Sequence, residues 1–130
     1  NHQRMTDLRA AKVDAVAEYI DDQRIELGPD SGDIVVVGWG STYGPIYQAT
    51  RKTGVSFVHL RHINPLPKNL RELLGRFDKV LIPEMNDGQL STLLRDKLCM
   101  ETLPFSKVTG QPFLIRELVE KIESLRGDAS

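Results

Sequence analysis

The sequence predicts an α/β fold in three layers, α/β/α, with a mostly parallel sheet of about five strands between the helices. Short runs of β-branched and aromatic residues alternate with longer segments in which apolar residues recur at helical spacing. The run at residues 34–37 is apolar at every position, which is typical of a strand covered on both faces. Because parallel strands need a crossover between them, we expect right-handed β-α-β units.

The first 32 residues are expected to form a helix and a linker ahead of the sheet. Thr6 can cap this helix, whose apolar residues recur at helical spacing up to about Ile25: Val13, Val16, Ala17 and Ile20. The sequence Gly-Pro-Asp-Ser-Gly at residues 28–32 then ends the pattern. A helix that precedes the first strand is not a crossover, so we expect it to lie on the outside of the domain as an arm.

At the end of the first strand, residues 38–42 have the sequence Gly-Trp-Gly-Ser-Thr and lead directly into a helical pattern. The glycines permit a sharp turn, and Ser41 or Thr42 can cap the helix that follows. Pro45 falls in the first turn of that helix, where its missing N–H is harmless, and Gly54 ends the helix. Open α/β sheets bind ligands beyond the carboxyl ends of their strands, so a ligand could lie at this corner.

The middle of the chain predicts two more strands, at residues 55–60 and 79–83. Between them, residues 61–67 form a loop that two prolines stiffen, and Pro67 starts a helix. One apolar stripe is expected along this helix, formed by Leu70, Leu73, Leu74 and Phe77. Asp78 then breaks the helical pattern.

The third strand leaves the sheet through residues 84–88, in which Asn86 or Asp87 can cap the next helix. The apolar stripe of that helix consists of Leu90, Leu93, Leu94 and Leu98. Residues 99–103 and 106–108 predict two weaker strands of the edge type.

Gln111 and Pro112 are expected to open the last helix. Its apolar stripe consists of Ile115, Leu118, Val119, Ile122 and Leu125. The α/β domain is therefore expected to span residues 33–126, with a frayed tail at residues 127–130.

Composition and charge exclude several classes of function. Lysine and arginine (17) nearly balance aspartate and glutamate (18) without a basic run, which argues against a nucleic-acid-binding protein. No apolar window reaches the roughly 18 residues of a membrane span, so we expect no membrane partner. The one cysteine, Cys99, has Leu98 and Met100 beside it and is expected to be a buried structural thiol. A chain without an internal disulfide suits a reducing, cytoplasmic compartment.

The glycine-rich corner resembles a phosphate site, since backbone N–H groups at a helix start bind anions. A dinucleotide fingerprint, however, needs a third glycine where this chain has Tyr43, with Gly44 one residue further on, and the Walker lysine is missing. We therefore expect a structural turn. The alternative function that stays open is a stand-alone small-ligand or nucleotide-binding α/β module that uses this corner.

Titratable residues near the strand ends do not form a catalytic or metal-binding set. His59 and His62 would point to opposite faces of a strand, so one metal ion could not easily bind both, and His59 is expected to be satisfied in or beside the core. Glu84 has no second titratable partner nearby in the sequence, which favours a solvent-facing or interface hydrogen bond. We predict no catalytic, cofactor-binding or metal-binding residue in this domain.

Polar residues nevertheless gather where the predicted strands end. They are Ser41, Thr42, Arg61, Asn64, Glu84, Asn86 and Gln89. Because the carboxyl ends of parallel strands share one edge of a sheet, we predict that these residues form a polar edge that packs on a neighbouring domain or subunit.

Four ordered motifs carry a resemblance to a known family. They are a GWGS corner, an HLR…NPLP loop, a VLIPE-x-N-x-GQL segment and a KVTGQPF segment, within residues 33–122. With these motifs the chain resembles the C-terminal domain of the alpha subunit of 2-oxoacid:ferredoxin oxidoreductases, particularly the 2-oxoglutarate type. More distantly, it is similar to the C-terminal domain of the transketolase superfamily.

The resemblance implies a non-catalytic assembly domain within a larger enzyme. Such enzymes oxidatively decarboxylate a 2-oxoacid to acyl-CoA, with a thiamine diphosphate-binding beta subunit, Mg, iron–sulfur clusters, coenzyme A and ferredoxin as the electron acceptor. The thiamine cofactor lies between the beta subunit and another part of the alpha subunit. No thiamine-binding, cluster-binding or catalytic residue of the family therefore falls on this sequence, and we expect no cofactor to be bound by this domain alone.

Overall fold

The computed structural model describes residues 20–85, 88–107 and 111–127. These residues form alternating strands and helices that follow one another along the chain. In order they are β1 (Gly32–Trp39), the 3-10 turn η1 (Gly40–Thr42), α2 (Tyr43–Thr53), β2 (Ser56–Leu60), α3 (Leu70–Leu74), β3 (Phe77–Glu84), α4 (Gln89–Leu98), β4 (Leu103–Ser106) and α5 (Ile115–Gly127). None of the described helices is both long and apolar enough to cross a membrane.

The sheet has the strand order β2-β1-β3-β4, and every neighbouring pair is parallel. This confirms the predicted α/β fold with a mostly parallel sheet. Within the described ranges the sheet has four strands instead of about five. In place of the two weak strands predicted at residues 99–103 and 106–108, one strand, β4, pairs with the end of β3, and Val108 lies outside the described residues.

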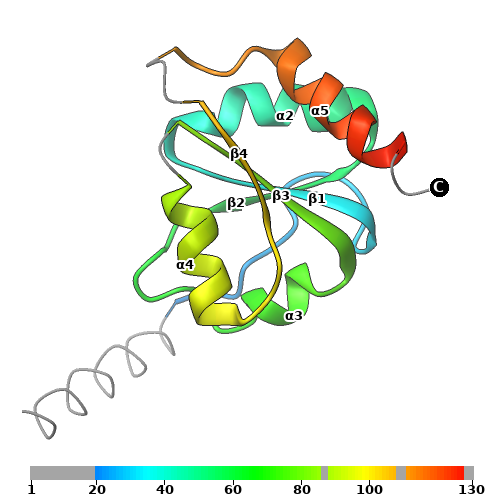
Figure 1. The fold of residues 1–130 in the computed structure, drawn as a ribbon. Coiled ribbons are helices and arrows are strands. Elements are labelled where there is room, and N and C mark those ends of the chain that lie inside the picture. The colour runs from blue at the N-terminus through cyan, green and yellow to red at the C-terminus, as the bar shows by residue number, and fades with distance from the viewer. Residues whose placement is uncertain (1–19, 86–87, 108–110, 128–130) are drawn as a thin grey trace, which may run out of the picture.

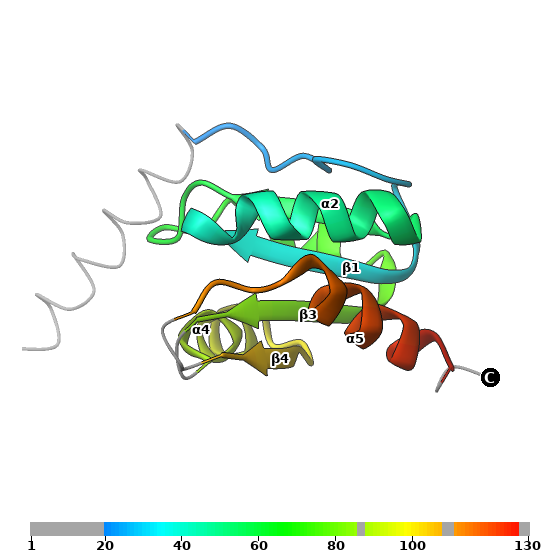
Figure 2. The same ribbon diagram turned by 90° about the horizontal axis from the view of Figure 1, so that it is seen from above.

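Helices cover both faces of the sheet, as Figures 1 and 2 show. Val35 and Val37 of β1 face α3 and α4, while Ile34 and Val36 face α2 and α5. Both sets are almost fully buried. The unbroken apolar run of β1 therefore follows from its position as a central strand between two helical layers. The stripes predicted for α4 and α5 are confirmed as their core faces, since Leu90, Leu94, Leu118, Ile122 and Leu125 are buried.

The helix predicted after Pro67 is shorter than expected. The helix α3 ends at Leu74, and Phe77 and Asp78 already belong to β3. Phe77 is nevertheless buried in the same cluster as Leu74, because it is the first residue of β3 and lies beneath α3. The apolar character was predicted correctly, but the helical assignment of Phe77 was wrong.

The last helix begins four residues later than predicted, at Ile115. Two side chains hold the preceding segment in a non-helical path. The Lys107 ammonium donates to the Pro112 carbonyl at 3.1 Å, and the N–H of Leu114 donates to the Glu117 carboxylate at 2.9 Å. Lys107 and Glu117 also form an ion pair at 2.6 Å, so this pair fixes where α5 starts.

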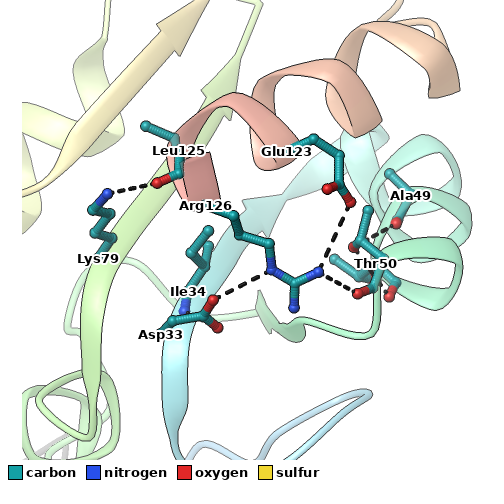
Figure 3. A network of polar contacts seen from close by, with 9 residues as sticks. Asp33, Ile34, Ala49, Thr50, Lys79, Glu123, Leu125 and Arg126 are labelled. Carbon is teal, nitrogen blue, oxygen red and sulfur yellow. Dashed lines mark hydrogen bonds and ion pairs between the residues drawn. The ribbon is translucent and has the colours of Figure 1, made fainter. Parts of the chain in front are cut away.

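The far end of α5 is tied to the amino ends of the strands (Figure 3). Arg126 donates to the Asp33 carboxylate at 3.3 Å and to the Thr53 carbonyl at the end of α2 at 2.7 Å. On the other side, the Lys79 ammonium donates to the Leu125 carbonyl at 2.7 Å. These bonds satisfy carbonyl groups at the ends of both α2 and α5, which helices leave without internal partners.

Residues 20–31 run along the outer edge of β2 instead of forming a helix. Leu27 and Phe57 form an antiparallel bridge with backbone hydrogen bonds in both directions. Gln23 and Asn69 exchange two further hydrogen bonds, at 2.8 and 2.9 Å. The helix predicted to continue to about Ile25 is therefore absent from residues 20–25, and its earlier part lies outside the described residues.

Candidate functional site at the carboxyl edge of the sheet

The predicted polar edge is formed by residues from three successive strand exits. The described members are Ser41 and Thr42 after β1, Arg61 and Asn64 after β2, and Glu84 and Gln89 around the exit of β3. Asn86 lies outside the described residues. Since the strands are parallel, all three exits lie at the same edge of the sheet. Ser41, Arg61, Asn64 and Gln89 are exposed there, whereas Thr42 and Glu84 are buried.

Thr42 serves the turn itself and does not cap α2. Its hydroxyl donates to the Trp39 carbonyl at 2.9 Å and accepts from the Trp39 N–H at 3.3 Å. Thr42 occupies the cap position of α2, but its side chain makes no hydrogen bond to the helix. The prediction that Ser41 or Thr42 caps this helix is therefore not met by Thr42. The 3-10 turn replaces the cap.

Gly38 is required by packing within the protein. A Cβ atom at this position would lie 2.6 Å from Cδ1 of Ile46, 3.2 Å from Oγ1 of Thr42 and 3.3 Å from Cε1 of Phe57. The missing side chain therefore lets α2 and β2 approach the end of β1. This observation gives Gly38 a packing role, whereas a Cβ atom at Gly40 would meet no heavy atom within 4 Å.

Glu84 is the member of the edge whose environment differs most from the prediction. Its side chain is 1% exposed, and its carboxylate accepts hydrogen bonds from the N–H groups of Leu90 at 2.6 Å and Ser91 at 3.2 Å. The prediction of a solvent-facing or interface hydrogen bond was therefore wrong. The first turn of α4 supplies unpaired N–H groups and a partial positive charge, and both stabilise the carboxylate.

Arg61 and Tyr43 converge on Glu26 beside the edge. The Tyr43 hydroxyl donates to the Glu26 carboxylate at 2.7 Å, and Arg61 lies 3.5 Å from the same oxygen. The hydrogen bond to Glu26 raises the pKa of Tyr43 above its ordinary value. Residues 20–31, called the arm from here on, are thereby joined to the start of α2 and to the exit of β2.

His59 lies half-buried against these groups. Its ring meets Tyr43 edge-on at 4.9 Å and lies 5.9 Å from the ring of Phe57. Its Nδ1 atom is buried and has no hydrogen-bond partner within the described part of the chain, so the expectation of a satisfied histidine was wrong. Burial, with a smaller contribution from the Arg61 charge, lowers the pKa of His59.

The described residues do not fit a metal ion or an iron–sulfur cluster. His62 is exposed and His59 is half-buried, and the described ranges contain no group of three or more His, Cys, Asp or Glu side chains that could hold a metal ion. Cys99 is exposed, so the prediction of a buried thiol was wrong. This residue ends α4 in a left-handed conformation, with φ 52°, which takes it off the buried stripe of the helix.

Sequence reasoning missed two surface features, although it assigned Ile115 and Val119 to the apolar stripe of α5. Gln23 and Asn69, which clamp the arm, lie in segments without periodicity and gave no signal. The other group lines an open groove between α2 and α5: Lys52, Leu114, Ile115, Arg116 and Val119. Leu114 is an apolar residue directly before α5 that does not belong to the apolar stripe of this helix. An apolar residue outside the stripe indicates an exposed apolar side chain, so the sequence did offer a signal for Leu114.

Comparison with curated proteins finds relatives that are much longer than this chain. The chain is 40% identical over 123 residues to 2-oxoglutarate oxidoreductase subunit KorA from Mycobacterium tuberculosis, covering 91% of this chain and 18% of the relative. It is 37% identical over 120 residues to 2-oxoacid:ferredoxin oxidoreductase 1, subunit alpha, from Aeropyrum pernix, covering 81% of this chain and 18% of the relative. The chain thus spans about one fifth of these relatives' length. No family model matches it.

Comparison with solved structures bears on the fold. A 2-oxoglutarate:ferredoxin oxidoreductase from Magnetococcus marinus, solved with 2-oxoglutarate, coenzyme A and succinyl-CoA bound, matches 95% of this chain and 23% of its own, with a TM-score of 0.84 at 24% identity. A split-gene transketolase in an inactive tetramer matches 72% of this chain and 38% of its own, with a TM-score of 0.55 at 12% identity. These comparisons confirm that the chain resembles a segment of 2-oxoacid:ferredoxin oxidoreductase alpha subunits and has a transketolase-like α/β fold.

Proposed function

We propose that this chain is the C-terminal, non-catalytic assembly domain of the alpha subunit of a 2-oxoacid:ferredoxin oxidoreductase, with 2-oxoglutarate as the substrate. The whole enzyme would oxidatively decarboxylate the 2-oxoacid to acyl-CoA and reduce ferredoxin. The observation that carries the proposal is the sequence identity of 40% across 91% of this chain to a short part of an oxidoreductase subunit.

The environment of the polar edge supports an assembly role. Glu84, which supplies the carboxylate of the edge, accepts hydrogen bonds from two backbone N–H groups of α4, and the Thr42 hydroxyl donates to the Trp39 carbonyl. General acid or base catalysis needs a titratable group within reach of a substrate proton. The exposed members that remain, such as Arg61, Asn64 and Gln89, are side chains suited to hydrogen bonds across an interface.

The cofactors of the whole enzyme would lie outside this domain. Thiamine diphosphate with Mg would be held by the beta subunit and the rest of the alpha subunit, and iron–sulfur clusters need cysteine ligands, of which this chain has one. The proposed partners are accordingly the thiamine-binding beta subunit and the rest of the alpha subunit, with coenzyme A and ferredoxin acting on the whole complex.

The test is purification of the tagged full-length gene product from its source cell. We expect a thiamine-binding subunit to co-purify in stoichiometric amount and the complex to oxidise 2-oxoglutarate with a low-potential acceptor only when coenzyme A is present. Recovery of a lone protein without thiamine or iron would overturn the proposal. Activity with another 2-oxoacid alone would retain the assembly role and overturn the substrate.

The nucleotide-binding alternative makes a separate prediction. A module that used the Gly38 corner would be stabilised by its ligand in proportion to ligand concentration. We expect no shift in melting temperature with nucleotides, because the corner has Tyr43 in place of the third glycine of a dinucleotide fingerprint and lacks the Walker lysine.

A further inference from the structure

The groove between α2 and α5 combines an exposed apolar side chain with two cations. Its volume is about 640 Å³, and the partly buried Ile115 and Val119 lie among its lining residues. Leu114 is 45% exposed, and it is the large apolar side chain that the described surface leaves most open to water. The groove therefore places apolar side chains of α5 next to the charges of Lys52 and Arg116.

The two cations of the groove have no ion-pair partner in the described ranges. The ion pairs of the described residues involve Arg61, Arg76, Lys107 and Arg126, and neither Lys52 nor Arg116. The nearest carboxylate in sequence, Glu117, feels the charge of Arg116, but its ion pair is with Lys107 at 2.6 Å. An occupant that complements this groove therefore carries a carboxylate next to an apolar side chain.

Residues 23–25 lie on the other face of the sheet from the groove. Gln23 is bound to Asn69, just before α3, and Ile25 packs against the cluster that faces α3 and α4. These residues therefore lie on the α3 side of the sheet, whereas α2 and α5 cover the opposite face (Figure 1). The groove thus lies on the face of the sheet opposite to the contacts of Gln23 and Ile25.

From these observations we infer that the groove lined by Lys52, Leu114 and Arg116 docks an acidic, partly apolar segment of a partner subunit. The inference rests on the proposed function, because it presumes a multi-subunit enzyme. In the complex, a partner carboxylate lies between the two cations, and an apolar partner side chain covers Leu114.

Zero-length carbodiimide coupling in the intact complex tests this contact. The reagent joins an amine to a carboxylate only when the two are in direct contact. We expect mass spectrometry to find Lys52 coupled to an Asp or Glu of the partner subunit. The Lys107–Glu117 pair, at 2.6 Å, is the internal positive control. Coupling of Lys107 without coupling of Lys52 would overturn the inference, as would coupling of Lys52 to a second copy of this chain or to its own polypeptide.

A charge-matched pair of variants tests the energetics in the same full-length complex. Lys52→Glu with Arg116→Glu should weaken binding of the partner subunit at least about tenfold, because like charges would then face each other. The control, Arg95→Glu with Lys97→Glu, makes the same charge change at exposed positions of α4, on the other face of the sheet. Equal affinity of the two double variants would overturn the inference. Failure of the unmodified complex to form would instead overturn the proposed function.

Discussion

The carboxylate of Glu84 remains in the core because the start of α4 supplies its hydrogen bonds. The Glu84 carboxylate accepts hydrogen bonds from two backbone N–H groups of α4. These bonds connect the end of β3 to the start of α4 across the loop between them. In this respect Glu84 does from the end of a strand what an N-cap residue usually does from the position just before the first turn of the helix.

Glu84→Ala should lower the free energy of unfolding by about 2 to 3 kcal/mol, since it leaves the buried N–H groups of Leu90 and Ser91 without an acceptor. Glu84→Gln keeps a carbonyl oxygen and should cost less. Urea denaturation of the chain and both variants measures the difference. Equal stability of Glu84→Ala and the unmodified chain would contradict this account.

His59 makes stability depend on pH in the direction of its lowered pKa. The folded state favours the neutral ring, so the contribution is fully present above 6.5, the ordinary value, and is lost as the pH falls through the lower folded value. The charged groups that act on the ring are Arg61, which opposes protonation, and Glu26, which favours it.

His59→Phe keeps an aromatic ring between Tyr43 and Phe57 and removes the titration. Between about pH 7.5 and about pH 5, the variant should lose less stability than the unmodified chain. Melting temperatures across this range give the comparison. Parallel profiles would show that His59 has no part in the acid sensitivity. Glu117, whose pKa the Lys107 hydrogen bond lowers, contributes in a separate window below 4.5.

Among the elements, α5 is fastened to the rest of the fold at both of its ends. Lys107 and Glu117 hold its start, and Arg126 joins its last turn to Asp33 and to the end of α2. The buried stripe between these ends packs on the same cluster as α2. These contacts therefore hold in place the two helices that line the groove.

Arg126→Gln should remove this fastening at one end. We expect a loss of about 1 kcal/mol, because the guanidinium is one-third exposed and its bond to Asp33 is screened by water. Hydrogen exchange should accelerate in the last turn of α5 and at the end of α2, while the start of α5 keeps its protection. Arg116→Gln, at an exposed position without an ion pair to the described residues, is the matched control. It should change neither the exchange rates in the last turn of α5 nor those at the end of α2.

Several elements could be predicted because their signals are local. The run at residues 34–37, the stripe of α4 and the glycine that ends α2 with φ 79° depend on neighbours in sequence, and all were confirmed. Phe77 was assigned to a helix because a helical stripe and a strand that returns beneath it bury the same residue type. Only the tertiary fold distinguishes the two.

The edge residues also divide into those whose position could be predicted from local sequence and those whose environment depends on the tertiary fold. That Arg61 and Asn64 lie at a strand exit follows from the order of the elements. The burial of Glu84 depends on where the start of α4 lies in space, and the unpartnered Nδ1 of His59 depends on Tyr43 and the arm. Contacts between residues far apart in sequence leave no periodic pattern, so they could not be predicted.

For the molecule as a whole, the exposed polar edge makes a prediction about assembly. Arg61→Ala, Asn64→Ala and Gln89→Ala, combined in the full-length subunit, should weaken association with its partner roughly tenfold, with only a small fall in melting temperature from the loss of the exposed Arg61–Glu26 pair. The control variant combines Gln48→Ala, Arg71→Ala and Thr92→Ala, which are exposed on α2, α3 and α4. Analytical ultracentrifugation of the complex compares the two. An edge variant that associates as tightly as the control would exclude these residues from the interface.

The bridge between Leu27 and Phe57 also bears on how the sheet avoids self-association. The edge strands are β2 and β4. The arm occupies the outer side of β2, and Pro104 deprives β4 of one backbone donor. A shortened version that started at Gly32 would leave the N–H and C=O groups of β2 free to pair with a strand from another copy. Residues 20–31 therefore cover part of this edge, and a version without them should be more prone to strand addition between copies.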